Sequence, residues 1–395
     1  MSKLLILVGL ACAVVIDAAA VRDNETTNHT QVTQGSSGEV CTKFGRRCLS
    51  GEVCDNKVCK CSNGKKGEAL IECVEQNENL CYLSADPHLT AYGEARVNVN
   101  MPCRYRASRF ITESPDAPIP EYTSCSFEIY ATNQLYKGRY IVASAHISVG
   151  VTDSASQVHS SFEVYKSNYD VEESSIYNYL ARIVKRDSIW GSSNGVIPGL
   201  DVDPSFDDVN NFAVLDVKQC DTRIKYRAYD RKRPLQSQLP GLSIQTPSHA
   251  KFVPNLGTYP ASVCGVPQDG TDLFTQRAKA LNVSNADTAI IYDILSQRPP
   301  QVDNPNADIC NDAFDAFSTS TNKASDVERC APIVVNAKIS TCLAESPFAP
   351  ADPFELFVDC LRFNQGNYDH STCMRLNDAS NLCKDFWEGP TLYRC

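Results

Sequence analysis

The tripeptide Asp86-Pro87-His88 is the part of this sequence that comes closest to a chemical motif. A carboxylate and an imidazole two residues apart suit a metal site or an acid–base pair. The same residues also suit the start of a strand, where proline sets the backbone and the polar side chains satisfy local hydrogen bonds. We favour the structural interpretation for Asp86 and His88. The chain has no HExxH and no phosphate loop, and its six histidines are scattered.

Cysteine is the other residue type whose number suggests chemistry. Of the nineteen cysteines, Cys12 lies in an N-terminal leader, which leaves eighteen. An even, dense set in a secreted chain indicates disulfides rather than zinc, because the secretory route is oxidising. We expect all eighteen to pair within the chain: Cys41, Cys48, Cys54, Cys59, Cys61, Cys73, Cys81, Cys103, Cys125, Cys220, Cys264, Cys310, Cys330, Cys342, Cys360, Cys373, Cys383 and Cys395.

The N-terminus predicts secretion. Residues 1–20 combine Lys3, an apolar run and Ala18-Ala19-Ala20, as a cleavable signal peptide does. Residues 21–40 are polar and predict a disordered, glycosylated leader. N-x-S/T sequons begin at Asn24, Asn28 and Asn282 and predict surface positions. No later segment has the roughly 20 apolar residues that a membrane span needs, so we expect an extracellular protein without a membrane span.

The charge argues against nucleic acid as a partner. The formal net charge is −10, which gives no general attraction to nucleic acid or to an anionic membrane. One local exception is Arg223, Lys225 and Arg227, which alternation places on one face of a strand opposite Ile224 and Tyr226. We interpret these three cations as a solvated face or a charged sheet edge that discourages aggregation.

Composition divides the remaining chain into three parts. Residues 41–75 hold six cysteines, the first five with the spacing C-x6-C-x5-C-x4-C-x-C, and almost no aliphatic residues, so disulfides must stabilise them. Residues 81–280 have the composition of a β domain with its own apolar core. A connector rich in Pro, Asn and Asp (297–308) leads to residues 308–395, which predict a small helical, disulfide-rich module.

Short strands dominate the middle part. β-Branched and aromatic residues separated by turn residues predict strands over 124–131, 138–151, 160–167, 210–220 and 222–229. No helical pattern separates them, which favours an antiparallel sandwich or barrel. Helices are expected over 330–344 and 352–363, the second beginning with Asp352 as N-cap and Pro353 as first helical residue.

These features resemble a known family. The pattern Cys81, Ala85-Asp86-Pro87-His88, Tyr92, Arg96, Cys103, Tyr105 is similar to the opening of the von Willebrand factor type D domain. The C-terminal cysteines resemble the eight-cysteine module that commonly follows that domain, and residues 41–75 resemble small EB- and EGF-like modules. The resemblance implies a mainly β fold. That fold would be an antiparallel, sandwich-like D domain flanked by a small disulfide knot and a small helical module.

The departures from the family pattern concern calcium and assembly. Where relatives have Phe-Asp-Gly, this chain has Tyr92-Gly93-Glu94, and a second hallmark survives only as Val263-Cys264-Gly265-Val266. Of the calcium carboxylates that the resemblance implies, Asp269 and Asp272 remain, so we expect no cofactor beyond weakly bound calcium. The family's Cys-x-x-Cys is reduced to Cys264, so covalent multimers are not expected.

Three functions fit these expectations. The favoured one is a secreted module protein with a structural or adhesive role in matrix, mucus, coat or egg envelope, which binds extracellular proteins or glycans. The second is an enzyme on the same fold, since ostracod luciferases resemble type D proteins and oxidise a small imidazopyrazinone; no catalytic residue is assigned. The third is a secreted effector of a gland or venom.

Overall fold

The structure analysed is a computed structural model of the 395-residue chain. It describes residues 48, 52–55, 58–68, 72–84, 88–92, 96–112, 122–136, 139–153, 157–168, 179–186, 202–207, 212–228, 241–252, 262–266, 273–345, 352–387 and 395. All of them belong to one compact unit, Ser37–Cys395.

Strands fill the first two thirds of the described part. They are β1 (Glu52–Asp55), β2 (Val58–Cys61), β3 (Lys65–Glu68), β4 (Glu72–Glu75), β5 (Asn79–Ser84), β6 (His88–Thr90), β7 (Arg96–Asn98), β8 (Arg104–Thr112), β9 (Tyr122–Tyr136), β10 (Arg139–Asp153), β11 (Gln157–Asn168), β12 (Tyr179–Arg186), β13 (Val202–Asp207), β14 (Phe212–Val217), β15 (Thr222–Arg227), β16 (Gly241–Thr246) and β17 (Lys251–Phe252). A short 3-10 helix, η1 (Lys218–Cys220), separates β14 from β15.

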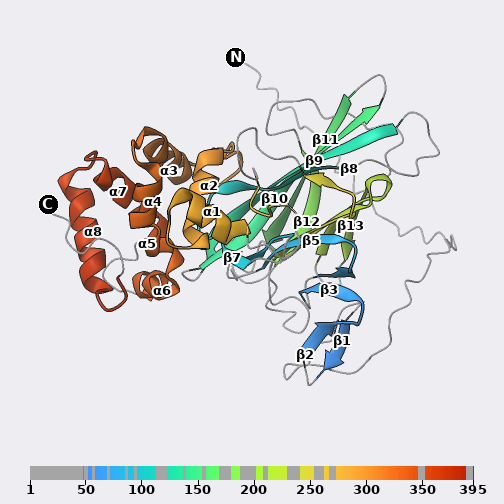
Figure 1. Ribbon diagram of the computed structural model, residues 1–395, viewed down its shortest axis with the longest axis horizontal. Helices are drawn as coiled ribbons and strands as arrows, with labels where there is room; N and C mark the ends of the chain where they lie inside the picture. The colour runs from blue at the N-terminus through green and yellow to red at the C-terminus, as the bar shows by residue number, and fades with distance from the viewer. Residues whose placement is uncertain are drawn as a thin grey trace, which may run out of the picture. The chain divides into compact units, whose positions relative to one another are not determined.

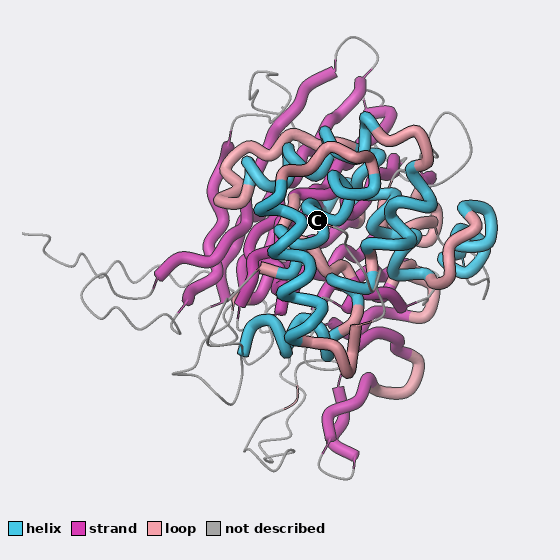
Figure 2. Tube along the Cα trace, turned by 90° about the vertical axis from the view of Figure 1, so that its left-hand side faces the viewer, coloured by secondary structure: helices cyan, strands magenta, loops and turns pink. Residues whose placement is uncertain are grey.

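Helices fill the rest of the described chain. They are α1 (Leu273–Leu281), α2 (Ala286–Gln297), α3 (Ala307–Thr319), α4 (Lys323–Cys330), α5 (Pro332–Val335), α6 (Ala337–Glu345), α7 (Pro353–Asn364) and α8 (His370–Leu382). Figure 1 shows them gathered beside the strands, and in Figure 2 they lie in front of the strands. The first helix begins at Leu273, before the end of the segment 81–280 in which only strands were expected.

Two antiparallel sheets carry the fold. The first sheet has the order β12-β11-β10-β9-β8-β17, and the second has the order β13-β14-β15-β16-β5-β6-β7. Small two-stranded sheets pair β1 with β2 and β3 with β4. The expectation of a mainly β, antiparallel and disulfide-rich fold is therefore confirmed.

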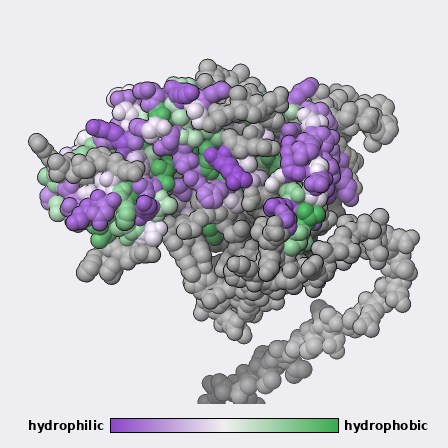
Figure 3. Space-filling model, turned by 60° about the horizontal axis from the view of Figure 1, so that its bottom comes forward, coloured by the Kyte–Doolittle hydropathy of each residue, from purple (hydrophilic) through white to green (hydrophobic). Residues whose placement is uncertain are grey.

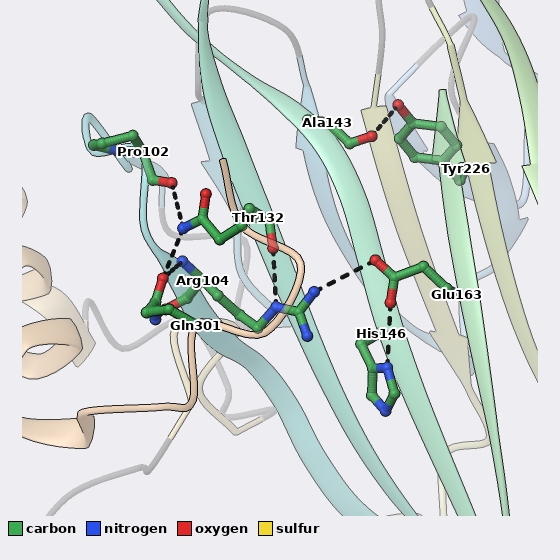
Figure 4. A network of polar contacts seen from close by, with 9 residues as sticks. Pro102, Arg104, Thr132, Ala143, His146, Glu163, Tyr226 and Gln301 are labelled. Atoms are coloured by element: carbon green, nitrogen blue, oxygen red, sulfur yellow. Dashed lines mark hydrogen bonds and ion pairs between the residues drawn. The ribbon is translucent and has the colours of Figure 1, made fainter. Parts of the chain in front are cut away.

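Alternation along each strand sends one set of side chains into a core that both sheets share. In β10, Ala145, Ile147 and Val149 are fully buried in that core, while His146 points to the opposite face. The Tyr226 hydroxyl of β15 crosses between the sheets and donates a 2.8 Å hydrogen bond to the carbonyl of Ala143 on β10 (Figure 4). The two sheets are thus joined by polar as well as apolar contacts.

The helices share this core with the sheets. Helix α2 contacts β7 and β8, and its residues Ile290, Ile291 and Ile294 belong to the same cluster of buried side chains. The expected connector 297–308 packs against the sheet. Gln301 is buried, accepts a hydrogen bond from the Arg104 N–H (2.8 Å) and donates one to the Arg104 carbonyl (3.1 Å). This segment is therefore part of the folded body.

Disulfides cross-link the chain both within and between its parts, as the cysteine count predicted. Besides the cysteines paired below, Cys54 is disulfide-bonded. The pairs between described cysteines are Cys48–Cys59, Cys61–Cys73, Cys81–Cys264, Cys103–Cys310, Cys125–Cys220, Cys330–Cys360, Cys342–Cys383 and Cys373–Cys395.

Candidate functional site

His88 takes part in a chain of hydrogen bonds that runs from the second sheet to helix α2. Its Nδ1 contacts Oδ1 of Asn98, its register partner on β7. The Asp287 carboxylate accepts hydrogen bonds from the backbone N–H and from Nδ2 of Asn98, at 2.8 and 2.9 Å. Because Nδ2 is committed to Asp287, Oδ1 faces His88, and Nδ1 of a neutral His88 carries the proton. The Nε2 atom of the neutral ring is then an acceptor.

This imidazole lines one of two adjoining hollows on the outer face of the second sheet. Their volumes are about 330 and 340 Å³, and they share Tyr82, Thr90 and Arg96. We call the two together the groove. Its lining residues are Lys66, Gly67, Leu80, Tyr82, Ser84, His88, Thr90, Tyr92, Arg96, Val97 and Asn98.

Strand register explains why these side chains meet. Tyr82 pairs with Thr90, and Thr90 pairs with Arg96, so the three lie in one row across β5, β6 and β7. Residues of one row point to the same side of a sheet. Cys81 and Leu83, the neighbours of Tyr82 in β5, belong to the shared core and lie on the opposite face. The groove therefore lies on the outer side of the sheet.

The cysteine-rich segment supplies one wall of the groove. Lys66 and Gly67 belong to β3, which pairs with β4. Val74 of β4 packs in a small buried cluster with Leu80 and Tyr82. A disulfide joins Cys61, the last residue of β2, to Cys73 in β4, so the hairpin is cross-linked within the cysteine-rich segment.

The described lining of the groove carries two cations within an acidic protein. Lys66 is half-buried and Arg96 is exposed, and none of the described lining residues is acidic. The surface seen in Figure 3 is mostly hydrophilic over its described residues, with hydrophobic areas that are small and separated.

The basic strand lies on the same outer face, and its environment corrects one expectation. Ile224 and Tyr226 face the core, as alternation predicted. The interpretation of Arg223, Lys225 and Arg227 as a charged sheet edge is wrong, because β15 lies between β14 and β16. Arg227 is also only 4% exposed, and its guanidinium lies 4.3 Å from the centre of the Phe212 ring. Stacking on an aromatic ring lets the sheet accommodate a buried arginine.

A second polar cluster, which the sequence did not predict, lies inside the protein (Figure 4). Arg104 donates to Thr132 Oγ1 (3.1 Å) and to Glu163 (3.4 Å), and His146 Nδ1 lies 3.2 Å from the other Glu163 oxygen. Burial lowers the pKa of Arg104, and the charge of Glu163 opposes that effect. Arg104 and His146 are each 1% exposed, so this cluster is closed to a substrate and braces the first sheet.

The sequence indicates this cluster only through the alternation of polar and apolar residues along β10. Ser144, His146 and Ser148 alternate with the apolar residues of β10, which indicates a polar face. The partners Arg104 and Glu163 are brought to His146 by strand pairing, which one sequence does not reveal.

The calcium prediction and part of the glycosylation prediction lie outside the described residues. The residues concerned are the calcium candidates Asp269 and Asp272 and the sequons at Asn24 and Asn28. The structure also does not describe Asp86, Cys41 and residues 1–40. The segments that flank the calcium candidates do meet, since the Tyr92 N–H donates to the Cys264 carbonyl (3.1 Å).

Two further features of described residues bear on expected sites. Asn282 is exposed at the end of α1, where a glycan has room, and its glycosylation stays a prediction. Among the described residues, Cys48, Glu52 and Cys59 lie within metal-ligand distance of one another. A disulfide consumes both of those sulfurs, so they do not form a metal site.

Compared with known proteins, the chain matches no family model and no curated protein. In the part of the chain that the structure describes, no helix has the length and apolar character to cross a membrane. The fold and the groove thus define a mainly β, disulfide-rich protein with a polar surface groove whose described lining holds two cations.

Proposed function

We propose that this protein is a secreted extracellular module protein with a structural or adhesive role, which works by binding other extracellular molecules. The observation that carries the proposal is the groove, which is open to solvent and held between disulfide-bonded segments. Cys61–Cys73 cross-links the cysteine-rich segment that forms its wall, and Cys81–Cys264 anchors the strand that carries Tyr82. A binding surface that is rigid before the ligand arrives loses little entropy on binding.

The disulfides support the extracellular setting. Bonds of this number persist in oxidising compartments and are rare in the cytosol. The resemblance of Cys81–Tyr105 to the opening of a von Willebrand type D domain supports the same class, since such domains are extracellular modules. The paired cysteines of the helical segment, such as Cys330–Cys360 and Cys342–Cys383, fit the proposed companion module.

The test is a binding panel with the secreted, full-length protein. Immobilised protein is exposed to purified collagen, mucin and glycosaminoglycan, and saturable binding is measured by surface plasmon resonance. We expect saturable binding to at least one of them, abolished when the protein is reduced and alkylated. A parallel assay measures oxidation of an imidazopyrazinone with light emission. Turnover there, without binding in the panel, would replace this proposal with the enzyme.

A further inference from the structure

We propose that the groove recognises an acidic saccharide, a sugar ring bearing a sulfate or carboxylate group. This inference rests on the proposed binding function and specifies its ligand class. The described lining combines two cations with small neutral hydrogen-bonding groups, and that combination matches such a ring.

The cations come from two separate parts of the chain. Lys66 belongs to the cysteine-rich segment and lines the first hollow, while Arg96 belongs to β7 and lines both. An arginine has five N–H donors in a planar fork, so a protein partner leaves donors for a sulfate or carboxylate. Lys66 is half-buried, which strengthens its field relative to a fully solvated ammonium. An anionic group between them gains from both.

Neutral groups supply the remainder of the recognition. Ser84 and Thr90 offer hydroxyls in the hollow that Arg96 also lines, and His88 offers there the ring nitrogen that does not contact Asn98. A sugar hydroxyl is both donor and acceptor and pairs with each of these groups. Each hollow, at about 330 or 340 Å³, is within the usual range of small-ligand sites. The anionic substituent and the ring hydroxyls thus have separate partners.

An extended peptide is the weaker alternative. Peptides that add to a sheet need free backbone donors along an edge strand. The edge strand here is β7, and the backbone N–H of Asn98 is already bonded to Asp287 on α2. The groove therefore favours recognition by side chains.

Isothermal titration of the secreted, full-length protein tests the proposal. The probes are a sulfated disaccharide, its desulfated counterpart, a hexuronate disaccharide without sulfate, and a tetraglutamate peptide. The variant is Lys66→Gln/Arg96→Gln. The matched control, Lys279→Gln/Lys384→Gln, removes two exposed lysines that do not line the groove. Thermal unfolding of each variant verifies folding.

We expect the sulfated or the hexuronate disaccharide to bind at least about tenfold more tightly than the desulfated one, which corresponds to ~1.4 kcal/mol. The groove variant should lose about tenfold or more of that affinity, the control should lose none, and added salt should weaken binding. The wild-type comparison of charged and neutral sugars decides the matter even if the groove variant does not fold.

Several results would overturn the inference. Equal affinity for charged and neutral sugars would remove the role of charge and leave the adhesive function standing. Tighter binding of tetraglutamate would assign the groove to acidic peptides. If no saccharide binds while collagen or mucin still does in the panel, the ligand class is wrong and the binding function survives. An equal loss in the control variant would show that the effect is not local to the groove.

Discussion

Arg104 is a single residue whose buried guanidinium has lost its contact with water and gained hydrogen bonds within the protein. Hydrogen bonds to Thr132 and Glu163 compensate for that loss. Such a pair adds little net stability over apolar residues, but loss of one partner leaves the other charge buried. The stability of the fold therefore depends strongly on the presence of both Arg104 and Glu163.

Replacing Arg104 by methionine should therefore destabilise the protein by about 3–5 kcal/mol, because Glu163 is left as an uncompensated buried charge. Arg104→Met/Glu163→Gln should be less destabilised, since the amide is neutral and still accepts from His146. The exposed pair Lys60–Asp55 serves as the control, and Lys60→Gln should change stability by less than about 1 kcal/mol. Urea unfolding measures all three. A double variant no more stable than Arg104→Met would contradict the interpretation.

The residues of the groove illustrate what one sequence can predict. The Asp86-Pro87-His88 motif singled out His88, and alternation separated Ile224 and Tyr226 from the basic residues. The bond from Asn98 to Asp287 joins residues 189 positions apart, and it depends on how α2 packs on β7. Such long-range pairings are set by tertiary packing, which periodicity does not encode.

At the scale of elements, the start of α7 was predictable, whereas the single helix expected over 330–344 is wrong, because this range is divided among the end of α4, α5 and α6. Asp352 is the N-cap of α7 and accepts from the Phe354 N–H (2.8 Å), with Pro353 in the first turn, as expected. Capping is local chemistry and is legible in sequence. The burial of Gln301 after α2 was not predicted, because its polar, proline-rich surroundings are typical of a connector.

Asp352 also links α7 to the first sheet, and this gives a testable coupling. Its Oδ1 accepts a 2.6 Å hydrogen bond from the Tyr140 hydroxyl on β10, as well as the capping bond. Asp352→Ala should cost about 2 kcal/mol through the lost cap and the orphaned buried hydroxyl. Tyr140→Phe should cost about 1 kcal/mol. The double variant should cost less than the sum in thermal unfolding.

The control for this cycle is Asp378→Ala, an exposed position on α8, which should stay within about 0.5 kcal/mol of the parent. Strict additivity of Asp352→Ala and Tyr140→Phe would show that the two side chains do not interact in solution.

Helix α8 provides a pH-dependent test. The Thr372 N–H donates to the Asp369 carboxylate (2.7 Å), and this hydrogen bond lowers the pKa of Asp369 below its ordinary value. The unfolded chain then binds the proton more readily. The stabilisation is present above the unfolded pKa of about 3.9 and is lost as pH falls through the folded pKa.

Asp369→Asn keeps an N-cap acceptor but does not titrate. The difference in melting temperature between the parent and Asp369→Asn should therefore favour the parent near neutral pH and decline below about pH 4. Asp369→Ala, which loses the cap, should melt below both at neutral pH. A difference between parent and Asp369→Asn that stays constant from neutral pH to strong acid would contradict this role.

At the scale of the whole molecule, disulfides connect parts that lie far apart in the sequence. Cys103–Cys310 ties the first sheet to α3 across 207 residues, and Cys81–Cys264 anchors β5 across 183. Cross-links over long loops restrict the unfolded chain most, typically by about 2–5 kcal/mol each. The sequence predicted dense pairing through the cysteine count, but connectivity follows from spatial proximity and was not predictable.

We infer that the strands, the helices and the wall of the groove form one scaffold, and that its disulfides pair cysteines of a single chain. Mass mapping of disulfide-linked peptides from the protein expressed through a secretory pathway, digested without reduction after thiol alkylation, tests this most directly. We predict the linked pairs Cys61–Cys73, Cys81–Cys264 and Cys103–Cys310, and a monomer on non-reducing electrophoresis. A covalent dimer linked through Cys264, or free thiols at Cys103 and Cys310, would contradict it.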